Sequence, residues 1–223
     1  MRKVAFILWL FCSGITDAFA NNPLELYGDK IEFDVMRNGE VVGEHITRFS
    51  QNGDELRVSS HMNIDISLLF LPVYSFDYAA LEKWVAGKMV FLDVNVVDGS
   101  DRVAFTAEHQ KDGLRVQMDG RETEIMSDII TTNHWNVDVV KDNQVLNTLT
   151  GNLNAVTITP MGQEEIDILN GSMKAMRYDY SGDLMDTSVW YDDQGRWVKL
   201  RFLARDGSTI EYRCRTCKAR GQG

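Results

Sequence analysis

The chain has 223 residues and a formal net charge of −10, with 44% hydrophobic and 10% aromatic residues. This apolar content is sufficient for a packed core, and only three prolines interrupt it, so the composition argues against a disordered chain. The negative charge repels phosphate backbones and anionic lipid, which makes nucleic acids and membrane surfaces poor candidate partners.

Residues 1–20 have the three features of a secretory signal peptide. Arg2 and Lys3 supply the positive start, Val4 to Cys12 is apolar, and Ala18-Phe19-Ala20 is a small-x-small cleavage site. The apolar stretch is shorter than the roughly 20 residues that span a bilayer, and no later segment reaches that length, so we expect no transmembrane segment. The sequence therefore predicts a soluble, periplasmic or secreted protein that is cleaved after Ala20.

Turn signals divide the rest of the chain into short alternating or β-branched runs. They occur at Asn38-Gly39, Asn52-Gly53, Ala86-Gly87, Asp98-Gly99, Asp112-Gly113, Asp119-Gly120, Asn170-Gly171, Gln194-Gly195 and Asp206-Gly207. Such spacing is typical of an antiparallel meander. Helical periodicity is scarce, with the best candidates near Asp128 and at 136–141. We predict one all-β domain over residues 21–213, a curved, half-open barrel of about ten to twelve strands with at most one or two short helices, followed by a tail over residues 214–223.

The first two turns make conflicting predictions about the strand between them. A turn at Asn52-Gly53 pairs Phe49 with Leu56, whereas a two-residue turn at Asn38-Gly39 pairs Val35 with Val42 and so turns the opposite face of the shared strand inward. A bulge near Gly43, or a three-residue first loop, reconciles them.

The most distinctive pattern lies between Leu56 and Trp84, where apolar side chains occupy even-numbered positions through two strands bent at Pro72. The favoured interpretation is an ordinary core face. The alternative is a groove for a hydrophobic ligand, since long curved strands leave a concave apolar face. Together with two residues of the central region, the groove interpretation gives these candidate ligand-binding residues: Ile64, Ile66, Leu68, Phe70, Tyr74, Phe76, Tyr78, Trp84, His134 and Trp135.

His134-Trp135 lies in the least regular stretch of the chain. A catalytic histidine needs an orienting carboxylate, and Asp128 and Asp138 are near in sequence without a spacing that fixes them in space. The favoured interpretation is structural: Trp135 plugs one end of the barrel while His134 and its neighbours satisfy loop backbone groups. We predict no catalytic residue.

No metal or cofactor site is expected elsewhere. His45 and His61 are predicted to point to opposite faces, which disfavours a shared metal ion. The motifs of serine hydrolases, zinc proteases, P-loop proteins and dinucleotide-binding proteins are missing from the sequence.

The last two hairpins have the clearest register. A three-residue loop centred on Asp206 pairs Leu200 with Tyr212, and a Gln194-Gly195 turn pairs Val189 with Leu200 and Tyr191 with Val198. One face of this three-stranded unit is consistently apolar.

Cys214 and Cys217 form the one compact redox-capable motif. In an exported protein the expected outcome is a local disulfide. A reactive pair stays open, because Arg213, Arg215 and Lys218 lower the pKa of nearby thiols. A c-type haem is excluded because Lys218 stands where that motif needs histidine, and a four-thiolate zinc site lacks its second pair.

Four segments resemble an uncharacterised family of exported proteobacterial proteins, a domain of unknown function. They are EFDVMRNGEVVGEH, LLFLPVYSF, NHWN and VWYDDQGRWVKLRFLARDGSTIEYR. The resemblance covers nearly all of the chain after the signal peptide, implies a periplasmic or secreted setting, and brings no activity, ligand or site residue. The two cysteines are not part of it. At the level of fold alone, the predicted half-open barrel is similar to periplasmic lipoprotein carriers.

The leading hypothesis is a periplasmic binding or carrier module for a lipid-like or other apolar small molecule. The alternatives are a periplasmic enzyme that uses His134 with a nearby carboxylate, and a structural subunit of an envelope complex. The sequence names no protein partner.

Overall fold

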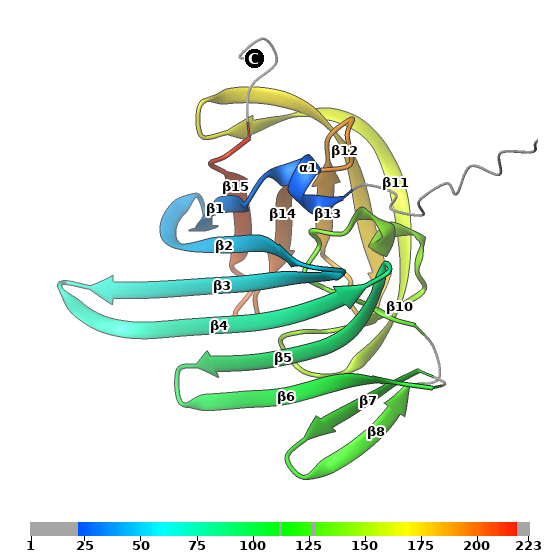
Figure 1. Cartoon of the computed structure of the whole chain (residues 1–223). Coiled ribbons are helices and arrows are strands. Elements are labelled where there is room, and N and C mark those ends of the chain that lie inside the picture. Colours follow the sequence, from blue (N-terminus) through cyan, green and yellow to red (C-terminus); the bar gives the residue numbers. More distant parts are fainter. Residues whose placement is uncertain (1–21, 112, 126–127, 218–223) are drawn as a thin grey trace, which may run out of the picture.

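A computed structural model describes residues 22–111, 113–125 and 128–217 (Figure 1). The predicted signal peptide, residues 1–20, and the last part of the predicted tail, residues 218–223, lie outside the described residues. The elements in chain order are α1 (Pro23–Tyr27), β1 (Lys30–Arg37), β2 (Glu40–Asn52), β3 (Glu55–Leu68), β4 (Leu71–Val85), β5 (Lys88–Asp98), β6 (Asp101–Gln110), β7 (Gly113–Met118), β8 (Arg121–Ile125), β9 (Ile130–Thr131), the 3₁₀ helix η1 (Val137–Lys141), β10 (Gln144–Leu146), β11 (Leu153–Ile168), β12 (Gly171–Gly182), β13 (Ser188–Tyr191), β14 (Trp197–Leu203) and β15 (Thr209–Cys214).

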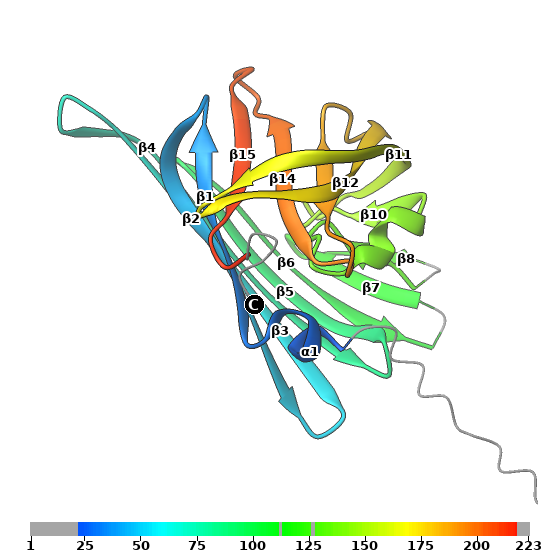
Figure 2. The ribbon, with the colours of Figure 1, turned by 90° about the horizontal axis from the view of Figure 1, so that it is seen from above.

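The strands form one curved sheet of fifteen members in the order β8-β7-β6-β5-β4-β3-β2-β1-β15-β14-β13-β12-β11-β10-β9. Every pairing is antiparallel except that of β9 with β10. The sheet bends round without closing, and its free edges are β8 and β9 (Figures 1 and 2). The predicted half-open, antiparallel meander is confirmed, with fifteen strands in place of the ten to twelve expected.

Pairing of the first strand with the last joins the two arms of the sheet. Phe33 of β1 lies opposite Cys214 of β15, and Val35 lies opposite Tyr212. Nothing local in the sequence predicts this contact, because it links the two ends of the chain.

The conflict at the front of the chain is resolved by a bulge, as one of the two alternatives predicted. Arg37 pairs with Glu40 across the Asn38-Gly39 turn, and the register then shifts so that Val35 pairs with Gly43. Gly43 is required there because a Cβ on it would lie 1.9 Å from the backbone oxygen of Asn63. Because of the bulge, the pairing of β2 with β1 and its pairing with β3 both turn the same side chains of β2 toward the core.

Two predicted registers are wrong, one because the turn lies elsewhere and one because of a bulge. The β2–β3 turn is formed by Gly53 and Asp54, so that Phe49 pairs with Val58 and not with Leu56. The shift is by two residues, which keeps each side chain on its predicted face: His45 is buried and His61 is exposed. At the other end, Val189 pairs with Leu200 and Leu200 with Tyr212 as predicted. A bulge places Tyr191 opposite Trp197 in place of Val198.

The stretch from Leu56 to Trp84 is a long hairpin and not two strands bent at Pro72. Leu69 and Phe70 form its turn, both with positive φ. Ser67 pairs with Pro72, but the next pair is Ile66 with Tyr74, so Val73 is an extra residue on β4. From this pair to the base of the hairpin, even-numbered residues of both strands therefore lie on the same face. The turn escaped prediction because it contains none of the glycine or asparagine residues that favour positive φ.

The concave face of the sheet holds the core, and the segment from β9 to β10 lies against it. The helix η1, close to the predicted 136–141, belongs to this segment, and Asn136 caps it by accepting a hydrogen bond from the Asp138 backbone at 3.0 Å. The helix α1 begins at Pro23 and lies at one end of the half-barrel. No helix in the described part of the chain is long and apolar enough to span a membrane.

Candidate functional site

A buried carboxylate fixes the segment from β9 to β10, residues 130–146, to the wall of the sheet. We call it the central segment. Glu82, on β4, has no exposed surface. Its Oε1 accepts hydrogen bonds from the Thr131 hydroxyl and the Asn133 amide, and its Oε2 accepts from the indole nitrogens of Trp84 and Trp135. Burial raises the pKa of Glu82, and the four donors oppose that effect. Among the described residues no cationic side chain is bonded to Glu82, so its hydrogen bonds come from four neutral donors.

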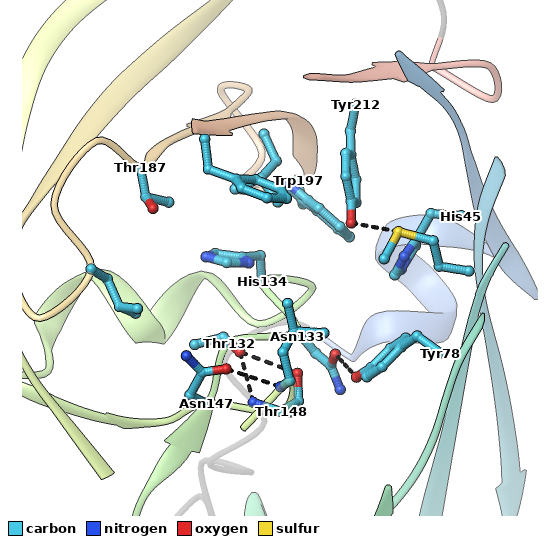
Figure 3. A pocket seen from close by; sticks show the side chains of 15 residues that line it. His45, Tyr78, Thr132, Asn133, His134, Asn147, Thr148, Thr187, Trp197 and Tyr212 are labelled. Atoms are coloured by element: carbon cyan, nitrogen blue, oxygen red, sulfur yellow. Dashed lines mark hydrogen bonds between the residues drawn. The ribbon is translucent and has the colours of Figure 1, made fainter. Parts of the chain in front are cut away.

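This anchoring holds the backbone around His134 in an uncommon conformation. His134 has a φ of 52°, in the left-handed region that non-glycine residues seldom adopt. The Tyr191 hydroxyl donates to the His134 carbonyl at 2.9 Å, and the Tyr27 hydroxyl donates to the Trp135 carbonyl at 2.8 Å. Both carbonyls are therefore fixed, and the imidazole is held among the side chains of the concave face (Figure 3).

A pocket of about 130 Å³ lies around the imidazole of His134, between the central segment and the concave face (Figure 3). Its walls come from β2 to β4 on one arm, from β14 and β15 on the other, and from the loops before β11 and β13. The lining residues are His45, Met62, Tyr78, Thr132, Asn133, His134, Asn147, Thr148, Leu149, Leu184, Thr187, Trp197, Leu200, Phe202 and Tyr212.

The two histidines of the pocket are neutral at pH 7. Burial lowers the pKa of His134 to about 4 and that of His45 to about 3. His45 shares a hydrogen bond of 3.1 Å with the Thr47 hydroxyl through Nε2. By contrast, neither ring nitrogen of His134, nor Nδ1 of His45, has a well-aligned hydrogen bond among the described residues. The Thr132 backbone lies near enough to the His134 ring to raise its pKa slightly against the larger effect of burial, without forming a bond of good geometry. A neutral imidazole offers one donor and one acceptor, and neither is well paired in His134.

The lining contains no acidic or basic side chain besides the histidines. Asp128 is bonded to Lys88 at 2.6 Å and Asp138 to Lys141 at 2.6 Å, so neither orients His134. Within the described ranges, no group of three or more potential metal ligands is present. The arrangement is therefore suited to binding an uncharged molecule through one hydrogen bond and apolar contacts.

The structure separates the predicted ligand-binding residues into three groups. Tyr78 and His134 line the pocket. Ile64, Phe76, Trp84 and Trp135 are buried in the core and Ile66 is half-buried, while Phe70 and Tyr74 are exposed near the β3–β4 turn. The Leu68 side chain lies outside the described part of the structure.

Sequence reasoning missed the opposite wall and the buried carboxylate. Trp197 and Tyr212 come from strands far in sequence from residues 56–84, and only the tertiary fold brings them opposite Tyr78. His45 lies on the adjacent strand β2, opposite Met62 of β3. For Glu82 a signal exists: it occupies an even, inward-facing position in that stripe, where a charged residue needs buried partners.

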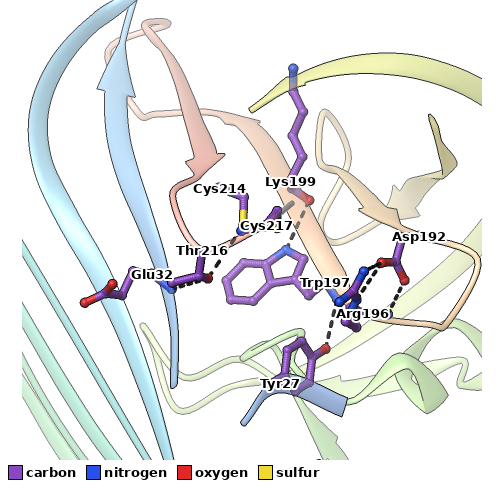
Figure 4. Close-up of a disulfide and its surroundings, with 9 residues drawn as sticks. All are labelled: Tyr27, Glu32, Asp192, Arg196, Trp197, Lys199, Cys214, Thr216 and Cys217. Carbon is purple, nitrogen blue, oxygen red and sulfur yellow. Dashed lines mark hydrogen bonds and ion pairs between the residues drawn. A yellow bond between two sulfur atoms is a disulfide. The ribbon is translucent and has the colours of Figure 1, made fainter. Parts of the chain in front are cut away.

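Cys214 and Cys217 are joined in the structure, with their sulfur atoms 2.00 Å apart (Figure 4). Cys214 is fully buried, and its sulfur accepts a hydrogen bond from the Cys217 backbone at 3.1 Å. Of the cations expected to activate these thiols, Arg213 and Arg215 both bind the carboxylate of Asp34. Lys218 lies beyond the described residues. The placement favours a structural bond over a reactive pair.

A family model with the description "Domain of unknown function (DUF6134)" matches residues 33–215. No curated protein and no solved structure matches the chain.

Proposed function

The chain belongs to the DUF6134 family, a domain of unknown function, and we propose that it is an exported binding protein that holds a small, uncharged, mostly apolar molecule against His134. This proposal keeps the hypothesis of a hydrophobic-ligand carrier and places the ligand in the pocket, away from the outer part of the β3–β4 hairpin.

The observation that carries the proposal is the unpaired imidazole of His134. A buried polar group without a hydrogen-bond partner costs about 1–3 kcal/mol, and native proteins seldom retain one without a reason. His134 has two such nitrogens, is only 6% exposed and lines a pocket. Both ring nitrogens are closed to solvent in the structure, so the ring must turn toward the pocket before a ligand hydroxyl, amide or carbonyl can bond to it. Such a bond would recover this cost, and the recovered free energy would favour binding.

The volume of the pocket limits the ligand. A cavity of about 150 Å³ in another protein accommodates benzene, whereas sites for drug-sized molecules measure about 300–1,000 Å³. At about 130 Å³ the pocket fits a single ring or the end of a longer apolar chain. A lipid-like ligand would thus place only one end in the pocket.

The charge of the pocket selects a neutral ligand. With both histidine pKa values near 3 to 4, the lining carries no formal charge at pH 7. Burying an ion without a counter-charge is strongly unfavourable. The enzyme alternative gains no support, because no carboxylate reaches the His134 ring.

The proposal that the protein is exported rests on the signal-like residues 1–20 and on the disulfide, which persists in oxidising compartments. It predicts that protein recovered from the periplasm or culture medium begins at Asn21. Mass measurement of the intact chain tests this, and a chain retained in the cytoplasm with residues 1–20 attached would contradict it.

The binding proposal is tested with phenol and benzene, two probes of nearly equal size of which only phenol forms a hydrogen bond. We expect phenol to bind several-fold more tightly than benzene by calorimetry, as one net hydrogen bond of about 0.5–1.5 kcal/mol predicts. The His134→Phe variant replaces the imidazole with a somewhat larger ring that has no hydrogen-bonding atom, and it should lose this preference.

The matched control is His61→Phe, which alters an exposed histidine on the opposite face of β3. It should bind both probes as the unmodified protein does. Equal affinity for phenol and benzene in the unmodified protein, or a preference that survives His134→Phe, would sink the proposal. Native mass spectrometry of protein from its natural compartment then identifies what is bound there.

A further inference from the structure

The hairpin of β3 and β4 extends past the rest of the sheet. Strand β2 pairs with β3 only as far as Gly43 opposite Ile64, and β5 pairs with β4 only from Asp98 opposite Phe76. Residues 65–75 therefore form a two-stranded ribbon with no neighbouring strand, which projects from the body of the molecule (Figures 1 and 2).

The end of this ribbon is apolar and exposed. We define the hairpin tip as Leu69, Phe70, Leu71, Val73 and Tyr74. The exposed fractions are 101% for Phe70 and 84% for Leu69, and the other three members are also exposed. Soluble proteins expose single apolar side chains routinely, but a contiguous exposed group indicates an interaction surface.

The backbone of the turn reinforces this interpretation. Leu69 and Phe70 have φ values of 50° and 69°, in a region that is unfavourable for bulky side chains. Glycine or asparagine would form the same turn without this cost. The turn thus presents two large apolar side chains at a position where the local conformation favours small polar ones.

Apolar residues also lie on both faces of the ribbon. From Ile66 to Tyr74 the sequence ISLLFLPVY contains no charged residue, and Ser67 is its only small polar one. Charges begin at the base: the Tyr74 hydroxyl donates to Asp98 at 2.7 Å, and Asp65 is exposed next to Ile66. An aromatic side chain with its hydroxyl at the polar boundary is typical of a membrane–water interface.

From these observations we propose that the hairpin tip inserts into the surface of a bilayer of zwitterionic lipid. A protein groove would cover one face of a ribbon, whereas lipid surrounds an apolar projection on all sides. Three residues of each strand reach about 10 Å, which matches the roughly 5–10 Å depth of interfacial insertion. Deeper entry is excluded because the open strand edges carry unpaired backbone groups.

The charge of the protein sets the class of lipid. The chain has a net charge of −10, and the base of the hairpin is acidic at Asp65 and Asp98. Anionic lipid is therefore repelled, while an uncharged headgroup layer is not. The proposal thus departs from the expectation, drawn from charge alone, that all membrane surfaces are poor partners. Attachment should rest on apolar contact alone, and salt should not weaken it.

Flotation of the purified protein with phosphatidylcholine vesicles tests the proposal. We expect the unmodified protein to float with the vesicles and Phe70→Ser to partition at least about tenfold less, as the loss of one buried phenyl group predicts. The control is Met161→Ser, which removes an exposed apolar side chain from β11 and should float normally. Vesicles with phosphatidylglycerol should bind less protein.

Contact with the acyl region is tested separately with Phe70→Trp and brominated lipid. The test uses protein that begins at Asn21 and so lacks Trp9, which lies outside the described residues. The four remaining tryptophans, on β4, β13, β14 and the central segment, are buried, so in this protein only a tryptophan at the tip should be quenched. Absence of flotation, equal flotation of Phe70→Ser, or no quenching would overturn the proposal. So would a dimer in lipid-free solution that Phe70→Ser dissociates, because a second copy would then cover the tip.

Discussion

The indole N–H of Trp135 donates a hydrogen bond of 2.9 Å to the carboxylate of Glu82, fifty-three residues earlier in the chain. This contact, with the three other donors to the same carboxylate, joins the central segment to β4. The position of His134 in the pocket depends on it, because His134 directly precedes Trp135.

Replacement of Glu82 by glutamine should destabilise the fold strongly. Glutamine has one acceptor oxygen where the carboxylate has two, and its NH₂ group would face two donors. Leaving two buried donors unpaired at about 1–3 kcal/mol each predicts a loss of about 2–6 kcal/mol in the free energy of unfolding. Urea denaturation measures this. Glu124→Gln, on the exposed edge strand β8, is the control and should change stability by about 0.5 kcal/mol or less.

Replacement of His134 by phenylalanine should stabilise the ligand-free protein. The substitution removes two buried nitrogens that lack well-aligned partners, whereas the larger ring and the φ of 52° oppose it, so we expect a net gain of at most about 1 kcal/mol. Thermal unfolding without added probe measures it. A marked loss of stability would mean that the imidazole has a structural partner, and it would remove the main support for a ligand site.

Stability should fall as the pH falls from about 6.5 to about 4. The pKa of His134 is about 4 in the folded protein and 6.5 when unfolded, so in this range the unfolded chain binds a proton that the folded chain does not. The difference between these two pKa values corresponds to about 3 kcal/mol in the free energy of unfolding. Glu82, whose folded pKa is raised, acts in the opposite direction above pH 4.5.

The contribution of His134 is isolated by comparison with His134→Phe, which should lose less stability between pH 6.5 and 4.5 than the unmodified protein. Urea midpoints at a series of pH values provide the measurement. Parallel curves for the two proteins would show that His134 is protonated equally in the folded and unfolded states.

The Cys214–Cys217 bond should contribute little to stability. The closed loop is very short, and loop entropy predicts less than the roughly 3 kcal/mol of a 15-residue loop. The same turn is also held by hydrogen bonds of the Arg215 backbone to Glu32 and of the Leu169 backbone to Cys214. The free energy of unfolding of Cys217→Ser should therefore lie within about 2 kcal/mol of that of the unmodified protein. Thiol counting on denatured, unreduced protein from the natural compartment should detect no free thiol at these two positions.

Much of the fold is predictable because turns and alternation are local. The Asn-Gly and Asp-Gly pairs indicate the meander, and the conflict between two turns indicates the bulge at Gly43. The short strands β8, β9 and β10 have only two to five residues, too few for a period-two pattern to be recognised. The Leu69-Phe70 turn lacks any turn residue, and it was missed for that reason.

The pocket is less predictable than the fold because its residues come from both arms of the sheet. Tyr78 and His134 were among the predicted ligand-binding residues, whereas Trp197 joins Tyr78 and His45 in the pocket only through the pairing of β1 with β15. The exposure of Phe70 was not foreseen, because alternation identifies a shared face and not how far neighbouring strands extend along it.

The pairing of β1 with β15 also makes the connectivity of the sheet circular. Read from β9 through β15 and on from β1 to β8, each strand lies beside the next. A permuted chain that began at β9 and joined β15 to the segment before β1 by a linker would thus build the same sheet entirely from consecutive neighbours. In folding, the permuted chain would no longer have to bring its two ends together. Its main long-range step would then be the docking of the central segment on Glu82.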